Sequence, residues 1–444
     1  MGLLKGVVGQ NPRQIAARVL GGRPGADDYI ENRLEAALAE GRLTPPDRAL
    51  CHHLVHGVAR WQDTLDWLIA RKTGGRPQRE TLAILLRLGL YQMLWLDRIP
   101  NHAAVNESVE MAKTMGFAAQ AGFVNAILRG YAREREATLA LLADLKTREP
   151  ALGYAHPAWL VARWQGRWGA ENCRRLMDWN NNPPPTFARV NRLRTTPEEL
   201  GARWVAEGVR FVPRRYDWVP GDGVFELESH PPLAGLPSFQ AGGFYLQDPS
   251  TLLAVAELGP QPGESILDTC AAPGGKTVLA AQWLRNQGRI VARDSQPDRL
   301  ALVGENCARL GVTCVTLEPG DGRTRLDSDG PRFDRVLVDA PCSNTGVMRR
   351  RVELRRRIQE AELTRMTVVQ GALLREAAAA LRPGGTLVYS TCSLEPEENG
   401  AVVQAFLAAR PDFKLMGERQ LLPFVDGVDG AYVARLEAPG KTDR

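Results

Sequence analysis

The sequence has few lysines, no long apolar run and no signal-like N-terminus, and each shortage excludes a class of protein. Of its basic residues, 7 are Lys and 49 are Arg. No apolar run reaches the roughly 18 residues that a membrane span requires, and the longest candidate, residues 82–96, contains Arg87. The N-terminal stretch MGLLKGVVGQNPRQ lacks a sustained apolar segment, so we expect no secretory signal and no membrane partner.

The seven cysteines are scattered without CxxC spacing, and their number is odd. This pattern indicates reduced thiols in a cytoplasmic protein. The six histidines form no ligand set with them, so we expect no metal site. A net charge of +5 is too small to identify a partner, and the excess of Arg fits both phosphate binding and a GC-rich genome.

The chain length of 444 residues predicts several domains, and we divide it into three segments. Residues 1–145 read as an all-helical bundle, in which Thr44 begins a helix and apolar residues recur at spacings of three and four from Leu50 to Leu68. Residues 146–245 read as linker helices followed by a small α/β module. The boundary within this segment is the run NNNPPP at 180–185, which cannot continue a helix.

Residues 246–444 alternate between short β-rich runs and helical runs, which predicts a doubly wound parallel sheet. In such sheets ligands lie beyond the carboxyl ends of the strands. We expect helices at 276–284, 297–310, 363–381 and 396–409. The expected strands are Ser265–Leu267, Arg289–Ala292, Thr313–Leu317, Arg335–Val338 and Thr386–Tyr389.

The first expected strand leads into the glycine-containing turn DTCAAPGGKT at 268–277. A P-loop requires glycine where Cys270 stands, and a dinucleotide GxGxxG is broken by Ala272 and Pro273, so both of these readings fail. Asp294 follows the second strand and suits ribose hydroxyls, although it could also cap the next helix. Asp321 follows the third strand and could accept from an adenine amino group or be a plain turn residue. Together these residues predict a ligand that has a ribose and an adenine but no pyrophosphate. S-adenosylmethionine is such a ligand.

Two cysteines follow neighbouring strands of the predicted sheet, Cys342 in VDAPCS and Cys392 in YSTCS. Most free cysteines are buried small hydrophobes, and this is our interpretation of those remote from the sheet edge. Two thiols at the carboxyl ends of neighbouring strands are the groups that methylation of a pyrimidine carbon requires. A thiolate that adds to C6 of cytosine makes C5 nucleophilic, and a base then removes the C5 proton.

The motifs LDTCAAPGGKT, GDGR, VDAPCSNTGVMRR and YSTCSLEPEEN resemble those of the RNA cytosine-C5 methyltransferases of the Nop/Sun class. The resemblance implies that Cys392 is the nucleophile, that Cys342 assists product release and that Asp339 holds the base. It also implies a Rossmann-like methyltransferase fold. The implied S-adenosylmethionine ligands are Cys270, Ala271, Ala272, Pro273, Gly274, Gly275, Lys276, Asp294, Asp321 and Asp339.

The first segment resembles the NusB-like RNA-binding domain that precedes such enzymes in bacteria, on the motifs ALCHHLVHGVARWQDTLDWLI and GFVNAILRG. The combined resemblance implies a monomeric enzyme acting on ribosomal RNA, with 16S rRNA as the expected substrate, and an RRM-like middle module. Two alternatives stay open. One is the same chemistry on transfer RNA or another ribosomal site, and the other is an RNA-binding assembly or antitermination factor with a vestigial catalytic domain.

One loop departs from the family pattern. After VMRR the family usually has a His/Asn-Pro-Asp segment, whereas this chain has an arginine-rich run at 349–357. We interpret this run as a loop that contacts RNA phosphate, with a solvated helix start as the alternative.

Overall fold

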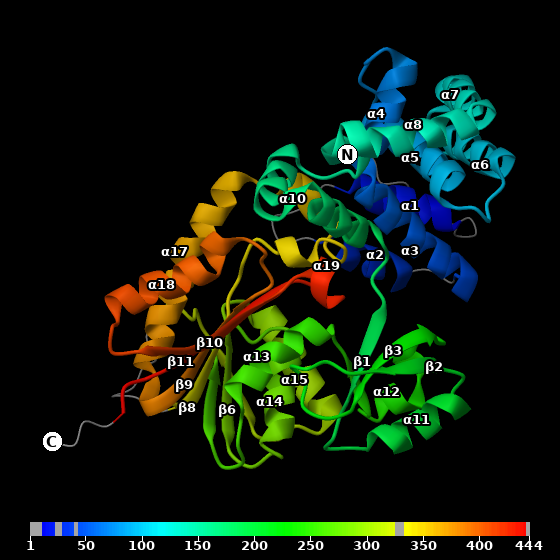
Figure 1. The fold of residues 1–444 in the computed structure, drawn as a ribbon. Coiled ribbons are helices and arrows are strands. Elements are labelled where there is room, and N and C mark those ends of the chain that lie inside the picture. The colour runs from blue at the N-terminus through cyan, green and yellow to red at the C-terminus, as the bar shows by residue number, and fades with distance from the viewer. Residues whose placement is uncertain (1–10, 23–28, 40–42, 325–332, 441–444) are drawn as a thin grey trace. The chain divides into compact units, whose positions relative to one another are not determined.

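The computed structural model describes residues 11–22, 29–39, 43–324 and 333–440, so most of the N-terminal stretch used to exclude a signal lies outside it. The chain forms two compact units, Met1–Asn182 with Met348–Arg357, and Pro183–Val347 with Ile358–Arg444 (Figure 1). Within the described residues, no helix combines the length and apolarity that crossing a membrane requires.

The first unit is built of helices joined by short turns. Thr44 caps one of them as predicted, because its side chain accepts a hydrogen bond from the Asp47 amide at 3.3 Å. The helix that begins at Ala158 ends at Asn181, directly before the proline run. The helices are α1 (Pro12–Gly21), α2 (Ile30–Ala39), α3 (Pro45–Arg60), α4 (Gln62–Thr73), α5 (Glu80–Trp95), α6 (Asn101–Thr114), α7 (Ala121–Arg133), α8 (Arg135–Arg148), α9 (Pro150–Gly153) and α10 (Ala158–Asn181), with the 3-10 turn η1 (Ala118–Gln120).

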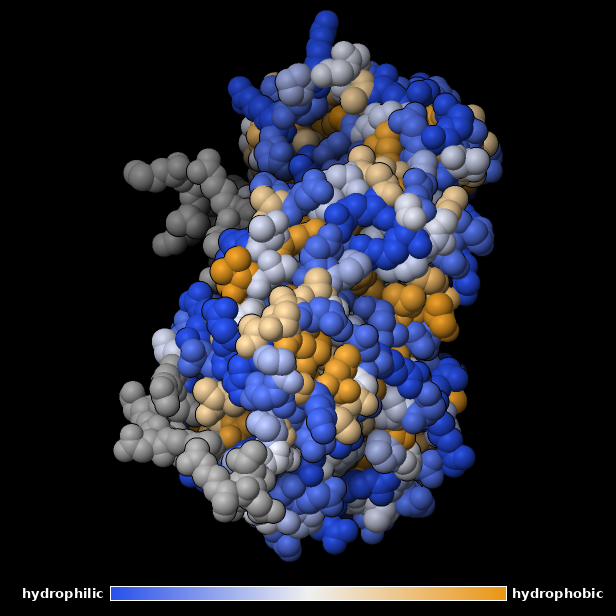
Figure 2. Space-filling model, turned by 60° about the vertical axis from the view of Figure 1, so that its left-hand side comes forward, coloured by the Kyte–Doolittle hydropathy of each residue, from blue (hydrophilic) through white to orange (hydrophobic). Residues whose placement is uncertain are grey.

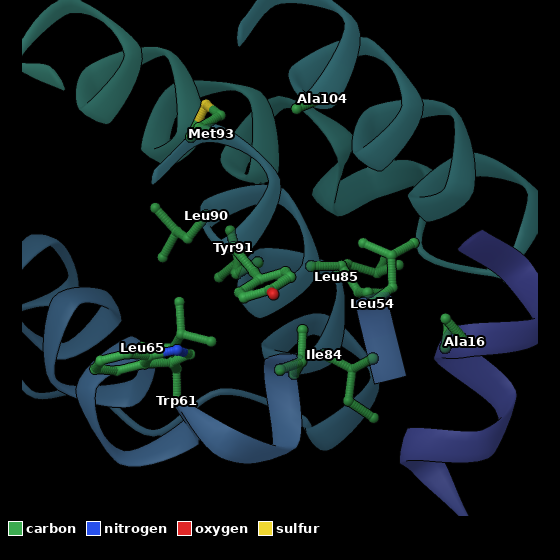
Figure 3. Packing of buried hydrophobic residues seen from close by; sticks show 14 of the residues in the cluster. Ala16, Leu54, Trp61, Leu65, Ile84, Leu85, Leu90, Tyr91, Met93 and Ala104 are labelled. Carbon is green, nitrogen blue, oxygen red and sulfur yellow. The ribbon is translucent and has the colours of Figure 1, made fainter. Parts of the chain in front are cut away.

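The predicted apolar stripe forms the core of this unit, although a turn at Trp61 divides it between α3 and α4. Figure 3 shows Trp61 and Leu65 close to the side chains of α5. The ring of Tyr91 lies where a Cβ at Gly57 would be, 1.9 Å from the nearest ring atom, so only glycine permits this contact. Arg87 interrupts the apolar run because its guanidinium pairs with two carboxylates, Asp66 at 2.6 Å and Glu80 at 2.7 Å.

The arginine-rich run belongs to the helical unit, in which it forms the short helix α16 (Leu354–Arg357). The guanidinium of Arg355 is buried, and it donates to the carbonyl of Asn180 and the side-chain oxygen of Asn181, both at 2.7 Å, and to the Arg60 carbonyl at 3.1 Å. Arg349 is also buried and stacks on a tryptophan ring. The prediction of phosphate contact, and its solvated alternative, are therefore wrong for Arg349 and Arg355.

The second unit begins with a small antiparallel sheet in the order β2-β3-β1-β4. The side chain of Trp204 fills its core and contacts the rings of Phe211, Phe225 and Phe244 at centroid distances of 5.1–5.3 Å. This module contains β1 (Thr186–Val190), α11 (Pro197–Ala206), β2 (Arg210–Arg214), β3 (Val224–Ser229), η2 (Leu233–Gly235), α12 (Pro237–Gln240) and β4 (Phe244–Leu246).

The rest of the second unit is a seven-stranded sheet in the order β10-β11-β9-β8-β5-β6-β7. The strands from β9 to β7 pair in parallel, as predicted, whereas β10 and β11 pair antiparallel at one edge and are not predicted from the sequence. The strands are β5 (Ser265–Asp268), β6 (Arg289–Asp294), β7 (Val315–Pro319), β8 (Phe333–Asp339), β9 (Leu381–Thr391), β10 (Lys414–Leu421) and β11 (Ala431–Glu437).

Helices cover both faces of this sheet, with α13, α14 and α15 on one side and α17 and α18 on the other (Figure 1). The predicted helix 363–381 ends early at Ala379, because Leu381 begins β9, and the predicted helix 396–409 starts as the 3-10 turn η5 (Pro396–Glu398). The remaining elements are η3 (Pro249–Thr251), α13 (Leu252–Leu258), α14 (Gly275–Trp283), α15 (Pro297–Leu310), η4 (Thr345–Val347), α17 (Glu360–Ala379), α18 (Gly400–Ala409) and α19 (Pro423–Asp426).

The face of the molecule in Figure 2 is mainly hydrophilic, and its hydrophobic residues lie in separate groups. Large apolar side chains that are exposed come from different elements, including Val205 of α11, Val368 of α17 and Val425 of α19. The exposed apolar residues are therefore spread over several helices.

Candidate active site

The strand order creates a switch point between β5 and β8. From β5 the chain continues to β6 and β7 on one side, and it then returns to β8 and β9 on the other. In open parallel sheets this is where a crevice forms at the carboxyl ends. The predicted site residues follow the ends of these five strands, so the topology brings them to one edge of the sheet.

The turn between β5 and α14 is joined to the end of β6 through Asp294. One carboxylate oxygen of Asp294 accepts from the amide of Ala272 at 3.1 Å, and the other accepts from the amide of Gln296 at 3.0 Å. Asp294 therefore stabilises both the turn and the start of the next helix. A carboxylate offers about four acceptor positions, so this side chain can also accept from two ribose hydroxyls.

The two glycines of the turn lie close to neighbouring parts of the protein. Gly274 has φ +105°, in the left-handed region that favours glycine, and a Cβ there would lie 3.2 Å from Val303. A Cβ at Gly275 would lie 3.0 Å from the amide nitrogen of Gln247. The left-handed backbone accounts for glycine at 274, and close approach by a ligand, which the sequence suggested, stays a prediction for the pair.

Asp268, at the end of β5, is a site residue that the sequence reasoning missed. The hydroxyl of Thr277 donates to its Oδ2 at 2.7 Å, whereas the buried Oδ1 has no partner within hydrogen-bond geometry among the described residues. Burial raises the pKa of Asp268 to about 7. An acceptor without a partner beside the turn fits a ligand that carries donors, as S-adenosylmethionine does with its amino group and hydroxyls.

Lys276 pairs with Asp339 and thereby joins the turn to the end of β8. Its Nζ lies 2.6 Å from Oδ2 of Asp339, and the hydroxyl of Ser390 donates to Oδ1 at 2.8 Å. Burial opposes the charge on Lys276, but the Asp339 carboxylate outweighs burial and raises the pKa of Lys276. The structure thus places Lys276 at the carboxylate expected to hold the base.

The predicted adenine ligand Asp321 is engaged within its own turn. Both of its carboxylate oxygens accept from the guanidinium of Arg323, at 3.0 Å and closer, and the Arg323 amide donates to Oδ1 at 2.9 Å. These hydrogen bonds to Arg323 lower the pKa of Asp321. The contacts match the turn interpretation, and a role in binding adenine stays a prediction.

The two thiols lie next to each other where β8 and β9 end. The Sγ atoms of Cys342 and Cys392 are 3.3 Å apart, and the Cys392 thiol donates to Oδ1 of Asn344 at 3.1 Å. Asn344 adopts φ +60° and donates through Nδ2 to the Cys342 carbonyl at 2.8 Å. The hydrogen bond with Cys392, together with burial, raises the pKa of Cys342 well above its ordinary value.

Cys270 is a third cysteine at the same edge, but its surroundings differ. Its thiol accepts from the hydroxyl of Thr269 at 3.9 Å, and burial raises the pKa of Cys270 strongly. Cys342 and Cys392 lie with their Sγ atoms 3.3 Å apart, whereas Cys270 lies in the cofactor turn to which the sequence assigned it.

This fold and this set of acceptors define a Rossmann-like S-adenosylmethionine-dependent methyltransferase. Comparison with family models agrees: residues 255–437 match the 16S rRNA methyltransferase RsmB/F model, residues 10–133 the NusB family, and residues 156–218 the RsmF/B-like ferredoxin-like domain. The chain belongs to the 16S rRNA methyltransferase RsmB/F family. The fold class, the NusB-like domain, the cofactor S-adenosylmethionine and the activity as an RNA methyltransferase predicted from the sequence are thereby confirmed.

The chain is similar to ribosomal RNA small subunit methyltransferases B over most of its length. It is 33% identical to the probable ribosomal RNA small subunit methyltransferase B of Bacillus subtilis, over 93% of this chain and 95% of that protein. It is 37% identical to ribosomal RNA small subunit methyltransferase B of Klebsiella pneumoniae, over 93% and 96%. A crystal structure titled PH0851 shares the fold, with a TM-score of 0.79 and 24% identity over 97% of this chain and 99% of that one.

Proposed function

We propose that this protein transfers a methyl group to C5 of a cytosine in 16S ribosomal RNA through a covalent bond between Cys392 and C6. The observation that carries the proposal is the pair of thiols with Sγ atoms 3.3 Å apart, at the sheet edge that also holds the Lys276–Asp339 pair. The names of the relatives support ribosomal RNA of the small subunit as the substrate.

In this reaction Cys392 attacks as the thiolate. A bond forms between its Sγ and C6, and the electron pair of the C5–C6 double bond moves to C5. Asp339 holds the base through N3 or the exocyclic amino group and stabilises the adduct. After methylation Cys342, whose own proton has passed to solvent, accepts the C5 proton as a thiolate; the C5–C6 double bond forms again, the Sγ–C6 bond breaks and Cys392 leaves as the thiolate.

S-adenosylmethionine, when bound, supplies the electrophilic methyl group. Asp294 and the turn 270–276 would hold it, and the free Oδ1 of Asp268 is a further acceptor for it. Asp294 keeps acceptor capacity for hydroxyls after its two amide bonds.

The two thiols have different expected phenotypes, which tests the mechanism. Cys392→Ala should form no covalent complex with RNA, whereas Cys342→Ala should accumulate a complex that survives denaturing gels, because the adduct forms but is not released. Cys314→Ala, at a half-buried thiol away from the sheet edge, is the matched control. If the Cys392 variant methylates cytosine at the normal rate, the proposed nucleophile is wrong.

The substrate is tested separately by bisulfite sequencing of total RNA from cells with and without this gene. Loss of one protected cytosine in 16S rRNA is the expected result. Loss of a site in transfer RNA instead would preserve the chemistry and change the substrate. A vestigial enzyme would change no cytosine and would bind no S-adenosylmethionine in calorimetry.

The proposal includes a monomeric protein in the cytoplasm. A reducing compartment keeps the Cys392 and Cys342 thiols available for reaction. Size-exclusion chromatography with light scattering should give a mass near the 48.8 kDa of one chain.

A further inference from the structure

Behind the two thiols lies a fully buried carboxylate that the proposed chemistry does not use. It belongs to Glu398, the last residue of η5, six positions after Cys392. Its Oε1 accepts from the amide of Ser343 at 2.8 Å and from Nε2 of Gln370 at 3.1 Å. Its Oε2 accepts from the hydroxyls of Ser343 and Ser393.

The two serines are the residues that directly follow the two cysteines. Ser343 follows Cys342 and Ser393 follows Cys392, and their hydroxyl oxygens lie 3.1 Å apart. One carboxylate therefore binds both loops at the position next to each thiol. Glu398 thus bridges the two loops, because its Oε2 accepts from one hydroxyl on each loop.

Burying the Glu398 carboxylate costs desolvation free energy, which suggests that it has a role beyond filling space. The four groups that donate to Glu398 are an amide, two hydroxyls and a side-chain amide, and all of them are neutral. A buried carboxylate without an opposite charge is unfavourable, and several hydrogen bonds are needed to keep it charged. A neutral side chain would fill the same space with less desolvation, but it could not accept four hydrogen bonds.

Further hydrogen bonds join Glu398 and Gln370 to the segments around the two cysteines. The phenol of Tyr389, on β9, donates to the Glu398 carbonyl at 2.6 Å. Gln370 of α17 also donates to the carbonyl of Pro341, directly before Cys342, at 3.0 Å. The amide of Gly346 donates to the Cys392 carbonyl at 2.9 Å, so the two loops are also joined through their main chains.

We propose that Glu398 is a positioning residue that sets the distance and orientation between the Cys342 and Cys392 thiols. The inference rests on the proposed function, in which one thiol attacks and the other assists release. Displacing either thiol by about 1 Å should slow the reaction on the order of 10²-fold. Because Glu398 touches neither substrate nor cofactor in this account, the binding of both should be unaffected.

Glu398→Gln is the first variant, since it keeps the size of the side chain and replaces one acceptor oxygen by a donor. We expect a single-turnover methylation rate reduced by about 10²-fold, with the Kd for S-adenosylmethionine within about twofold of the wild-type value. Glu362→Gln, a half-exposed carboxylate on α17 that pairs with Arg365, is the matched control and should leave both unchanged.

A second readout reports thiol geometry without RNA. Phenylarsine oxide bridges two thiols only when they are close, and mass spectrometry counts the bridged product. Wild-type protein should be bridged rapidly and Cys342→Ala not at all, whereas Glu398→Gln should be bridged at least tenfold more slowly. Failure of the proposed function would abolish the RNA result but leave this difference intact, so the two failures are distinguishable.

Folding of the variants is checked by circular dichroism. If Glu398→Gln does not fold, the double variant Ser343→Ala with Ser393→Ala decides the matter, because it removes the two hydroxyl donors and keeps the carboxylate. Slowed bridging and slowed turnover in that variant would support the proposal. A folded variant of either kind that is bridged and turns over at wild-type rates would overturn it.

Discussion

The two halves of the sheet edge hold their side chains in different ways. At the cofactor half, the carboxylates at the ends of β5 and β6 each accept hydrogen bonds from an adjacent turn or helix start. Both keep acceptor capacity: Oδ1 of Asp268 has no partner among the described residues, and each oxygen of Asp294 accepts only one amide. At the thiol half, Cys342 and Cys392 are joined to each other and supported by buried Glu398. In the proposed function the first half binds the cofactor and the second reacts, and the Lys276–Asp339 pair spans them.

The largest expected effect separates reaction from binding. Cys392→Ala should lower methylation at least about 10³-fold, because loss of a covalent nucleophile removes the reaction route. Calorimetry should give an unchanged Kd for S-adenosylmethionine, since the thiol lies in the other half. A variant that lost cofactor binding as well would show that the two halves are not independent.

Asp339→Asn tests the group that spans the halves. The substitution removes the charge that pairs with Lys276 at 2.6 Å. It also weakens the proposed hydrogen bond between residue 339 and the target cytosine. We expect a decrease in kcat of about 10²-fold, with a modest change in cofactor affinity. Stopped-flow or quench-flow single turnovers provide the measurement. An effect on cofactor affinity alone would move Asp339 into the cofactor half.

Asp294→Ala should produce the reverse pattern of Cys392→Ala. Loss of hydrogen bonds to a charged group costs about 1.5–3 kcal/mol, so the Kd for S-adenosylmethionine should rise by about 10- to 100-fold. The rate at saturating cofactor and the bridging of the thiols by phenylarsine oxide should stay near wild-type values. Asp294→Asn, which keeps one acceptor oxygen, is the matched variant and should show a smaller loss.

Asp268→Asn is expected to change the pH dependence of stability. Burial raises the pKa of Asp268 to about 7, so the folded protein binds this proton more tightly than the unfolded chain. The resulting stabilisation is complete below the ordinary aspartate pKa of about 3.9 and is lost as the pH rises through 7. The melting temperature of the variant should therefore fall less between pH 4 and 8 than that of the wild type. Parallel curves would contradict the raised pKa.

The smallest expected effect is that of Asp321→Ala. Its carboxylate is already engaged by Arg323, and exposed ion pairs contribute roughly 0–1 kcal/mol. We expect less than about a fivefold change in the Kd for S-adenosylmethionine, which a 1 kcal/mol limit implies. A change above tenfold would favour the predicted contact with adenine over the turn interpretation and would extend the cofactor half to β7.

Local patterns were enough to predict the parallel part of the sheet and the placing of Cys342 and Cys392 after neighbouring strands. Alternation of apolar strands and helices sets the order of elements, and Cys342 and Cys392 follow strands that pair as neighbours. The antiparallel strands β10 and β11 were missed, because strand pairing depends on partners distant in sequence. The burial of arginines in the run 349–357 was also not predicted, because composition does not distinguish a solvated guanidinium from a buried one such as that of Arg355.

The sequence by itself determined the class of fold and the cofactor, because strand–turn–helix motifs are local and their residues are adjacent, and it predicted the thiol chemistry, which stays a proposal. Only the tertiary structure decided which polar groups meet. Glu398 reaches both cysteine loops, and Lys276 turns toward Asp339, because parallel pairing brings the carboxyl ends of strands far apart in the chain to one edge. Hydrogen bonds act over about 3 Å, a distance that spacing along the chain does not specify.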